Sequence, residues 1–338
     1  MQNAISGAVK VNDDWRRWIA ENLIMEIHPQ GLFETLVRAG VPVPDAHAEI
    51  NAALQSPYIA GAQRLKNRLL KRDWVLDNRR RMEQLRSPEV PRIHKLPEEQ
   101  FFNDFYTAGR PVVITGMMED WPAMQNWNLD YFAQHFGDKE VQVQARRNSD
   151  EHYELNKLKH QQTMSFGEFT ELVRNAGKTN DFYMTANNDS QNRVALADLW
   201  NDIVQIPAYL DPQNPGGFFW FGPAGTITPF HHDLTNNFMA QVIGAKRVLM
   251  IPAHEINAIY NHEHCFTHVD ARKIDFDQYP AMRDARIQEA IIGPGEILFL
   301  PVGCWHFVEG LEVSVTMSFT NFKWDNNFTE RYPAQTFF

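Results

Sequence analysis

The sequence has few cysteines, no long apolar run and no excess of basic charge. Its two cysteines, Cys265 and Cys304, are too few for a disulfide scaffold, so packing has to stabilise the fold. No stretch approaches the roughly 20 apolar residues that a membrane-spanning helix needs. Residues 1–14 also lack the basic start and apolar run of a secretory signal. These absences predict a soluble, cytoplasmic protein with no membrane partner.

Acidic residues outnumber basic ones by 42 to 32, which gives a formal net charge of −10 at pH 7. A negative surface repels phosphate backbones, so we expect no nucleic-acid partner. The 338 residues are 43% hydrophobic and 12% aromatic, which is far from the composition of a disordered acidic chain. A chain of this length and composition can bury a large core, as one domain or two.

Residues 1–95 are predicted to form a helical extension. Apolar residues recur at three- and four-residue steps over 15–27, where Asp13 or Asp14 is placed to cap the helix start. Proline starts and glycine stops predict three more helices, over 31–38, 46–54 and 57–85. Prolines near residue 90 then mark a joint. We therefore expect a second domain over 96–338.

The last predicted helix carries nine basic residues and three acidic ones between positions 64 and 86. One interpretation is a docking face for an acidic partner. The other, which we favour, is a solvated helix face opposite an apolar stripe formed by Leu65, Leu69, Trp74 and Leu76.

After residue 96 the pattern changes to short apolar segments separated by Gly, Pro and Asn. No helix of the length that a parallel β-α-β sheet requires lies between the later ones. The pattern therefore predicts a mainly β, double-sheet jelly roll (double-stranded β-helix) or a related barrel, preceded by the helical region. The predicted strands are 111–114, 141–143, 182–184, 218–221, 238–242, 247–251, 297–300 and 313–319.

His231 and Asp233 stand two residues apart between two predicted strands. In extended backbone, residues i and i+2 point to the same face, so these side chains converge while His232 points away. His306, after the strand at 297–300, is the expected third ligand. Two imidazoles and one carboxylate on one face of an ion leave the opposite face open. This arrangement suits Fe(II) and O2, whereas a closed four-ligand zinc site has no vacancy.

Further motifs accompany these residues in order along the chain. They are GRPVVITG at 109–116, Trp121-Pro122, TPFHHD at 228–233, Asn237, Lys246, GPGEILFLP at 293–301 and Trp305-His306. Together they resemble the JmjC-type and cupin-like 2-oxoglutarate oxygenases over residues 96–324. The likeness is greatest to the branch containing the asparaginyl hydroxylase that inhibits hypoxia-inducible factor. The resemblance implies Fe(II) as the metal and 2-oxoglutarate as the cosubstrate.

The same resemblance implies roles for five residues around the metal. Lys246 would pair with the distal carboxylate of 2-oxoglutarate, assisted by the hydroxyls of Thr228 and Tyr183. Asn237 would lie near the metal-bound end of the cosubstrate. Ser318 stands where the asparaginyl hydroxylase has a second asparagine, and a serine hydroxyl can still donate one hydrogen bond.

The choice of Lys246 also has a physical basis. A lysine inside an apolar barrel is costly unless it meets an anion, which a dianionic cosubstrate provides. Neighbours on a strand face opposite ways, so one of Lys246 and Arg247 should point inward. We favour Lys246, with Arg247 as the alternative.

A second histidine group and one cysteine need separate interpretations. His262, His264, Cys265 and His268 place four ligands in seven residues, but their spacing matches no known zinc pattern, so we interpret them as a loop, with a separate metal site as the alternative. Cys304, near His306, is expected to be a packed small residue because no Cys-His-Asn arrangement is present.

The function predicted is that of an Fe(II)- and 2-oxoglutarate-dependent dioxygenase. It would hydroxylate a side chain of a protein or peptide and release succinate and CO2. A small metabolite as substrate and N-methyl-lysine demethylation are the alternatives within this chemistry. Outside it, the chain could be a metal-binding cupin without 2-oxoglutarate, or a non-catalytic scaffold. A homodimer formed through the helical extension is a further expectation.

Overall fold

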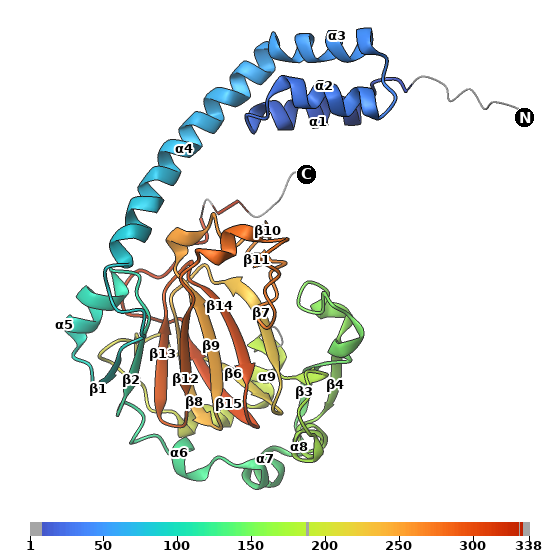
Figure 1. Ribbon diagram of the computed structural model, residues 1–338. Coiled ribbons are helices and arrows are strands. Elements are labelled where there is room, and N and C mark those ends of the chain that lie inside the picture. Colours follow the sequence, from blue (N-terminus) through green and yellow to red (C-terminus); the bar gives the residue numbers. More distant parts are fainter. Residues whose placement is uncertain (1–8, 187–188, 331, 334–338) are drawn as a thin grey trace, which may run out of the picture. The chain divides into compact units, whose positions relative to one another are not determined.

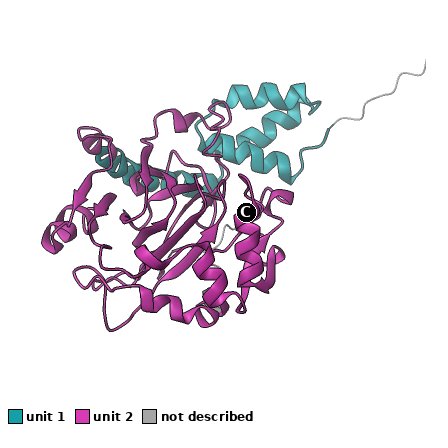
Figure 2. Cartoon of the chain, turned by 90° about the horizontal axis from the view of Figure 1, so that it is seen from below, with its two compact units in different colours: residues 1–79 teal, residues 80–338 magenta. Residues whose placement is uncertain are grey.

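The computed structural model describes residues 9–186, 189–330 and 332–333. The chain divides into two compact units, residues 1–79 and 80–338, coloured separately in Figure 2. Within the described ranges, no helix combines the length and apolarity needed to cross a bilayer. The boundary between residues 95 and 96, the cytoplasmic location and the homodimer stay predictions.

Four helices precede the β-rich part, as the sequence predicts. Apolar side chains of the first three helices and the loop after the second form a small core made of Ile19, Leu32, Leu36, Val41, Ala46 and Ile50. The cap of the first helix differs from the prediction, because the Asn12 side chain accepts the hydrogen bond from the Trp15 amide while Asp13 and Asp14 lie in the first turn. The helices are α1 (Asp13–Ile24), α2 (Pro29–Arg38), α3 (Val43–Leu54) and α4 (Pro57–Glu83).

The apolar stripe of α4 is not packed. Leu65, Leu69 and Trp74 are 60%, 49% and 68% exposed. Lys66 Nζ donates to Ile24 O at 2.8 Å and to a carboxylate oxygen of Glu26 at 2.7 Å. Residue spacing sets the face on which apolar side chains lie, but it does not decide whether another layer covers that face. The docking-face interpretation stays a prediction.

Eight antiparallel strands form the predicted double-stranded β-helix, and seven others widen it or stand beside it (Figure 1). The two larger sheets have the orders β1-β2-β13-β8-β15-β6 and β10-β11-β7-β14-β9-β12. The barrel strands are β6 (Phe218–Gly222), β7 (Ile227–His232), β8 (Asn237–Ile243), β9 (Lys246–Ile251), β12 (Gln288–Ile292), β13 (Glu296–Leu300), β14 (Trp305–Gly310) and β15 (Ser314–Phe319).

The remaining elements surround this barrel. The short strands are β1 (Arg92–His94), β2 (Val112–Thr115), β10 (Asn261–Glu263) and β11 (Phe266–Thr267), with a separate sheet of β4 (Gln161–Ser165), β3 (Glu140–Ala145) and β5 (Phe182–Tyr183). The helices are α5 (Glu98–Phe101), α6 (Ala123–Asn126), α7 (Leu129–Phe136), α8 (Phe166–Asn175) and α9 (Asp189–Ala195).

Both large sheets contribute side chains to the interior of the barrel. Met239 and Leu298 come from the first sheet and Val248, Met250 and Val308 from the second, and all five are buried in one apolar cluster. Burial of these side chains stabilises the sandwich at ~25 cal/mol per Å² of apolar surface. Of the residues predicted for the site, Asn237, Lys246 and His306 lie on these strands, where this packing holds them in place.

Candidate metal centre and its pocket

His231, Asp233 and His306 lie together although the chain separates them. The strand β14 pairs with β7, which places His306 directly opposite His231, and Asp233 follows the end of β7. Nε2 of His231 is 3.8 Å from one carboxylate oxygen of Asp233, and Nε2 of His306 is 3.9 Å from the other. One ligand atom from each of the three residues lies within 4.8 Å of the others.

Backbone carbonyls orient both imidazoles. Nδ1 of His231 lies 2.9 Å from Pro229 O, and Nδ1 of His306 lies 3.0 Å from Cys304 O. These contacts fix Nδ1 as the protonated nitrogen and leave Nε2 with a lone pair that faces Asp233. His232 turns away, as expected for an alternating strand, and its Nε2 is 2.9 Å from the hydroxyl of Tyr332.

The protonation states of His306 and Asp233 suit metal binding. Burial, followed by the nearby charge of His231, lowers the pKa of His306 and keeps its imidazole neutral. Burial of Asp233 acts to raise its pKa, but the nearby His306 and His231 and a hydrogen bond from Asn237 outweigh it, so the pKa is lowered. Two neutral imidazoles and one ionised carboxylate are the ligand set that non-haem Fe(II) oxygenases use.

Lys246 lies on β9 and is buried, at 2% exposure. Its Nζ donates to the hydroxyl of Tyr183 at 3.0 Å, and no ion pair forms at Nζ within the described part of the chain. Burial lowers the pKa of Lys246 to about 7. The alternative, Arg247, faces outward and pairs with Glu289 at 3.0 Å. Lys246 is therefore the inward cation that the sequence predicts.

A cavity of ≈ 430 Å³ contains the three ligands together with Lys246 and the other residues predicted for the site. Asn237 Nδ2 donates to Asp233 at 3.2 Å, while its buried Oδ1 has no hydrogen-bond partner among the residues that the structure describes. Ser318 Oγ accepts from the indole of Trp220 at 2.8 Å. The cavity lining includes all eight predicted residues, namely Tyr183, Thr228, His231, Asp233, Asn237, Lys246, His306 and Ser318.

The residues present fit an iron-bound dicarboxylate. The triad offers three ligand atoms, and the same cavity holds the buried Lys246, with which no carboxylate of the described residues forms an ion pair. A buried ammonium group without an anion is costly, so an anionic ligand near Lys246 would restore its charge balance. The unpaired Oδ1 of Asn237 is a further polar atom that a ligand or water can satisfy.

Several lining residues were not predicted from the sequence. Glu154 and Lys157 come from the turn segment before β4, Trp220 from β6, and Phe266 from β11. The ring of Phe266 stacks on His231, with centroids 6.0 Å apart. The aromatic run at 218–221 predicted a strand but not the wall of a pocket. The other three residues lie in loops or in the two-residue strand β11, where residue spacing has no periodic signal.

The second histidine group is divided between two cavities. His264 and Cys265 line the cavity of the triad, whereas His262 and His268 line a neighbouring one. Among the described residues, only the triad brings three ligand atoms within 4.8 Å of one another, so a zinc site made of all four is wrong. Cys304 is buried, and burial raises its thiol pKa to about 12, as expected of a packed, unreactive residue.

Comparison with known proteins agrees with this geometry. A family model described as a cupin-like domain matches residues 98–330. The chain is 33% identical over 249 residues to lysine-specific demethylase JMJ30 of Arabidopsis thaliana, covering 69% of this chain and 56% of that protein. It is 30% identical over 250 residues to lysine-specific demethylase 8 of Danio rerio, covering 68% and 58%.

A third relative has a different name. Over 274 residues the chain is 28% identical to tRNA wybutosine-synthesizing protein 5 of Gallus gallus, covering 76% of this chain and 82% of that protein. The matched region spans little more than half of the two demethylases. None of these three relatives is an asparaginyl hydroxylase, so the narrower resemblance to that branch stays a prediction.

Proposed function

The chain belongs to the cupin-like, JmjC-type family of Fe(II)- and 2-oxoglutarate-dependent oxygenases, and from this membership we propose that it hydroxylates a side chain of a protein or peptide. The observation that carries the proposal is the buried Lys246 in the same cavity as His231, Asp233 and His306. A metal-binding cupin without 2-oxoglutarate has no need of a buried cation facing the metal.

Each residue of the pocket has a separate task in this proposal. Fe(II) with chelated 2-oxoglutarate would supply the oxidation of a C–H bond by O2, with release of succinate and CO2. His231, Asp233 and His306 would hold the ion and leave one face open. Lys246, with the hydroxyls of Tyr183 and Thr228, would hold the distal carboxylate. Asn237 orients Asp233 through its amide, and Ser318 offers a polar contact.

Demethylation is the second candidate, favoured by the names of two relatives. It differs from stable hydroxylation only in the fate of the product, because a hydroxylated N-methyl group breaks down to formaldehyde. A small metabolite is a further alternative. The word tRNA in the name of the third relative describes that protein alone. Because this chain has a net charge of −10, we keep the expectation that it does not bind nucleic acid.

The products distinguish these functions. The protein is incubated with Fe(II), 2-oxoglutarate, O2 and either a peptide library or its N-methyl-lysine counterpart. We expect succinate to form with a stable gain of one oxygen atom on a peptide, measured by mass spectrometry. Formaldehyde with loss of a methyl group would instead establish the demethylase. Without O2, Fe(II) and 2-oxoglutarate should give the weak visible charge-transfer band of the chelate, and its absence would contradict the use of 2-oxoglutarate.

Binding of 2-oxoglutarate is expected to weaken as the pH rises above about 7. Because burial lowers the pKa of Lys246 to about 7, the ammonium group of the empty pocket loses its proton above that pH. Binding of the dianion must then take up a proton, so the apparent affinity should fall by up to about tenfold per pH unit. Titration calorimetry from pH 6 to 9 measures this effect. In Lys246→Arg the cation persists, so an equally steep fall there would assign the pH dependence to another group.

A further inference from the structure

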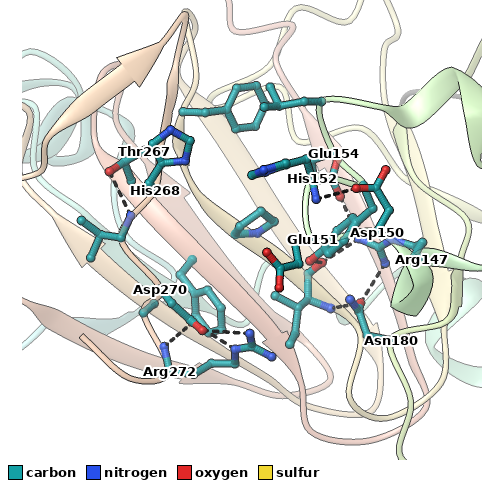
Figure 3. Close-up of a pocket in the computed structure, with 18 of the residues that line it drawn as sticks. Arg147, Asp150, Glu151, His152, Glu154, Asn180, Thr267, His268, Asp270 and Arg272 are labelled. Atoms are coloured by element: carbon teal, nitrogen blue, oxygen red, sulfur yellow. Dashed lines mark hydrogen bonds and ion pairs between the residues drawn. The ribbon is translucent and has the colours of Figure 1, made fainter. Parts of the chain in front are cut away.

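A second cavity, of ≈ 490 Å³, adjoins the cavity of the triad and is lined by three histidines. His152 comes from a turn segment, His262 from β10, and His268 from just after β11. Figure 3 shows His152 and His268 on the wall of this cavity. Glu154 and Phe266 line both cavities, so the histidines stand close to the candidate iron site without belonging to it.

The spacing of these imidazoles resembles that of metal ligands. The ring centroids of His262 and His268 are 4.1 Å apart at an interplanar angle of 42°. The two imidazoles of the triad, His231 and His306, are also 4.1 Å apart, at 55°. His152 lies 6.0 Å from His268. Imidazoles bound to one tetrahedral ion have centroids about 5 Å apart, a value between these two separations.

The charges around the cluster also favour a cation. Partial burial, followed by the neighbouring His262 and His152, lowers the pKa of His268, and a neutral imidazole keeps the lone pair that a metal needs. The carboxylates of Glu151 and Glu263 line the same cavity and form no ion pair with any residue that the structure describes. Figure 3 shows Glu151 beside His152. These carboxylates offset the charge of a bound cation.

We propose that His152, His262 and His268 bind one divalent ion of the zinc type, separately from the iron. Imidazole ligands prefer borderline ions such as Zn²⁺, Ni²⁺ and Cu²⁺ to Mg²⁺ or Ca²⁺. The ring nitrogens of these three histidines do not all lie within 4.8 Å of one another, whereas the ligand atoms of the triad do. In the proposed site the histidine side chains therefore rotate as the ion binds. All three are exposed to solvent, so their side chains have room to rotate. The backbone next to His152 is held in place, because the hydroxyl of Tyr153 donates to Ile227 O of β7 at 3.2 Å. The ion binds more weakly here than at the triad.

Counting bound metal tests the proposal without any measurement of turnover. The full chain is dialysed against buffered Zn²⁺, and the bound metal is measured by mass spectrometry. We expect two equivalents on the wild type and one on the triple variant His152→Ala/His262→Ala/His268→Ala. The variant Asp233→Ala/His306→Ala should also bind one, because it keeps the second site. His135→Ala, which removes an exposed histidine of α7, is the control and should keep two.

The outcome that overturns the proposal is a single equivalent on the wild type, or two on the triple variant. The single variant His152→Ala controls for misfolding of the triple variant, because this exposed side chain is not part of a core. It should lower the affinity for the second Zn²⁺ equivalent at least about tenfold. Co²⁺ gives an independent signal, because tetrahedral imidazole ligation produces visible absorption. That absorption should persist in Asp233→Ala/His306→Ala and disappear in the triple variant. The proposed oxygenase could fail its own test without affecting these results.

Discussion

Replacing Asp233 with Ala is expected to abolish turnover. The residue supplies the one carboxylate of the triad, and its two oxygens face Nε2 of His231 and of His306 at 3.8 and 3.9 Å. Without it the site keeps two imidazoles and loses the charge that partly neutralises a divalent ion. Removing a residue that only orients a metal ligand typically lowers metal affinity or activity by about 10- to 100-fold. Loss of a ligand itself should therefore lower turnover by at least about a thousandfold. The measurements are iron content and succinate formation under saturating 2-oxoglutarate.

The neighbouring histidine provides the control for this loss. His232 is buried, but its side chain contacts Tyr332 and Trp305 and points away from the triad. His232→Gln keeps a hydrogen-bonding group there and should bind iron within about threefold of the wild type. If Asp233→Ala kept full turnover, the chain would not use this triad. A non-catalytic scaffold would likewise retain its biological activity in this variant.

The sequence predicted the barrel, but not the strands that carry the metal ligands. Apolar segments such as 247–251 and 297–300 correspond closely to β9 and β13. The strands β7 and β14 were not predicted, although they hold His231 and His306. Their sequences include polar histidines where a core strand would have apolar residues, so the chemistry of the site interrupts the pattern that identifies a strand. The ligands were found from their spacing together with the ordered motifs that resemble the oxygenase family, and neither depends on that pattern.

The division of the second histidine group could not be predicted from spacing. His264 has a positive φ of 47° at the turn between β10 and β11, a conformation that few non-glycine residues adopt. The turn separates His264 and Cys265, which line the triad cavity, from His262 and His268, which line the neighbouring one. Four potential ligands in seven residues therefore line two different cavities, because the backbone direction at one residue decides where each side chain points.

Replacing Lys246 with Ala is expected to weaken 2-oxoglutarate binding far more than Fe(II) binding. Removing one partner of a buried lysine–carboxylate pair typically costs ~3–5 kcal/mol of free energy. At about 1.4 kcal/mol per factor of ten, this corresponds to a loss of about 100- to 4000-fold in affinity for the cosubstrate. The three metal ligands are untouched, so iron binding should change little. Calorimetry with Fe(II) alone, and then with 2-oxoglutarate added without O2, separates the two affinities.

Arg247→Ala is the matched control, because it removes the adjacent cation on the same strand. Arg247 faces outward and pairs with Glu289 at 3.0 Å, and an exposed pair contributes only about 0–1 kcal/mol. Its loss should therefore leave 2-oxoglutarate binding within about threefold. If Lys246→Ala reduced both affinities equally, Lys246 would be maintaining the shape of the pocket. If it reduced neither, the cosubstrate would not be anchored there, and a cupin that does not use 2-oxoglutarate would explain the site better.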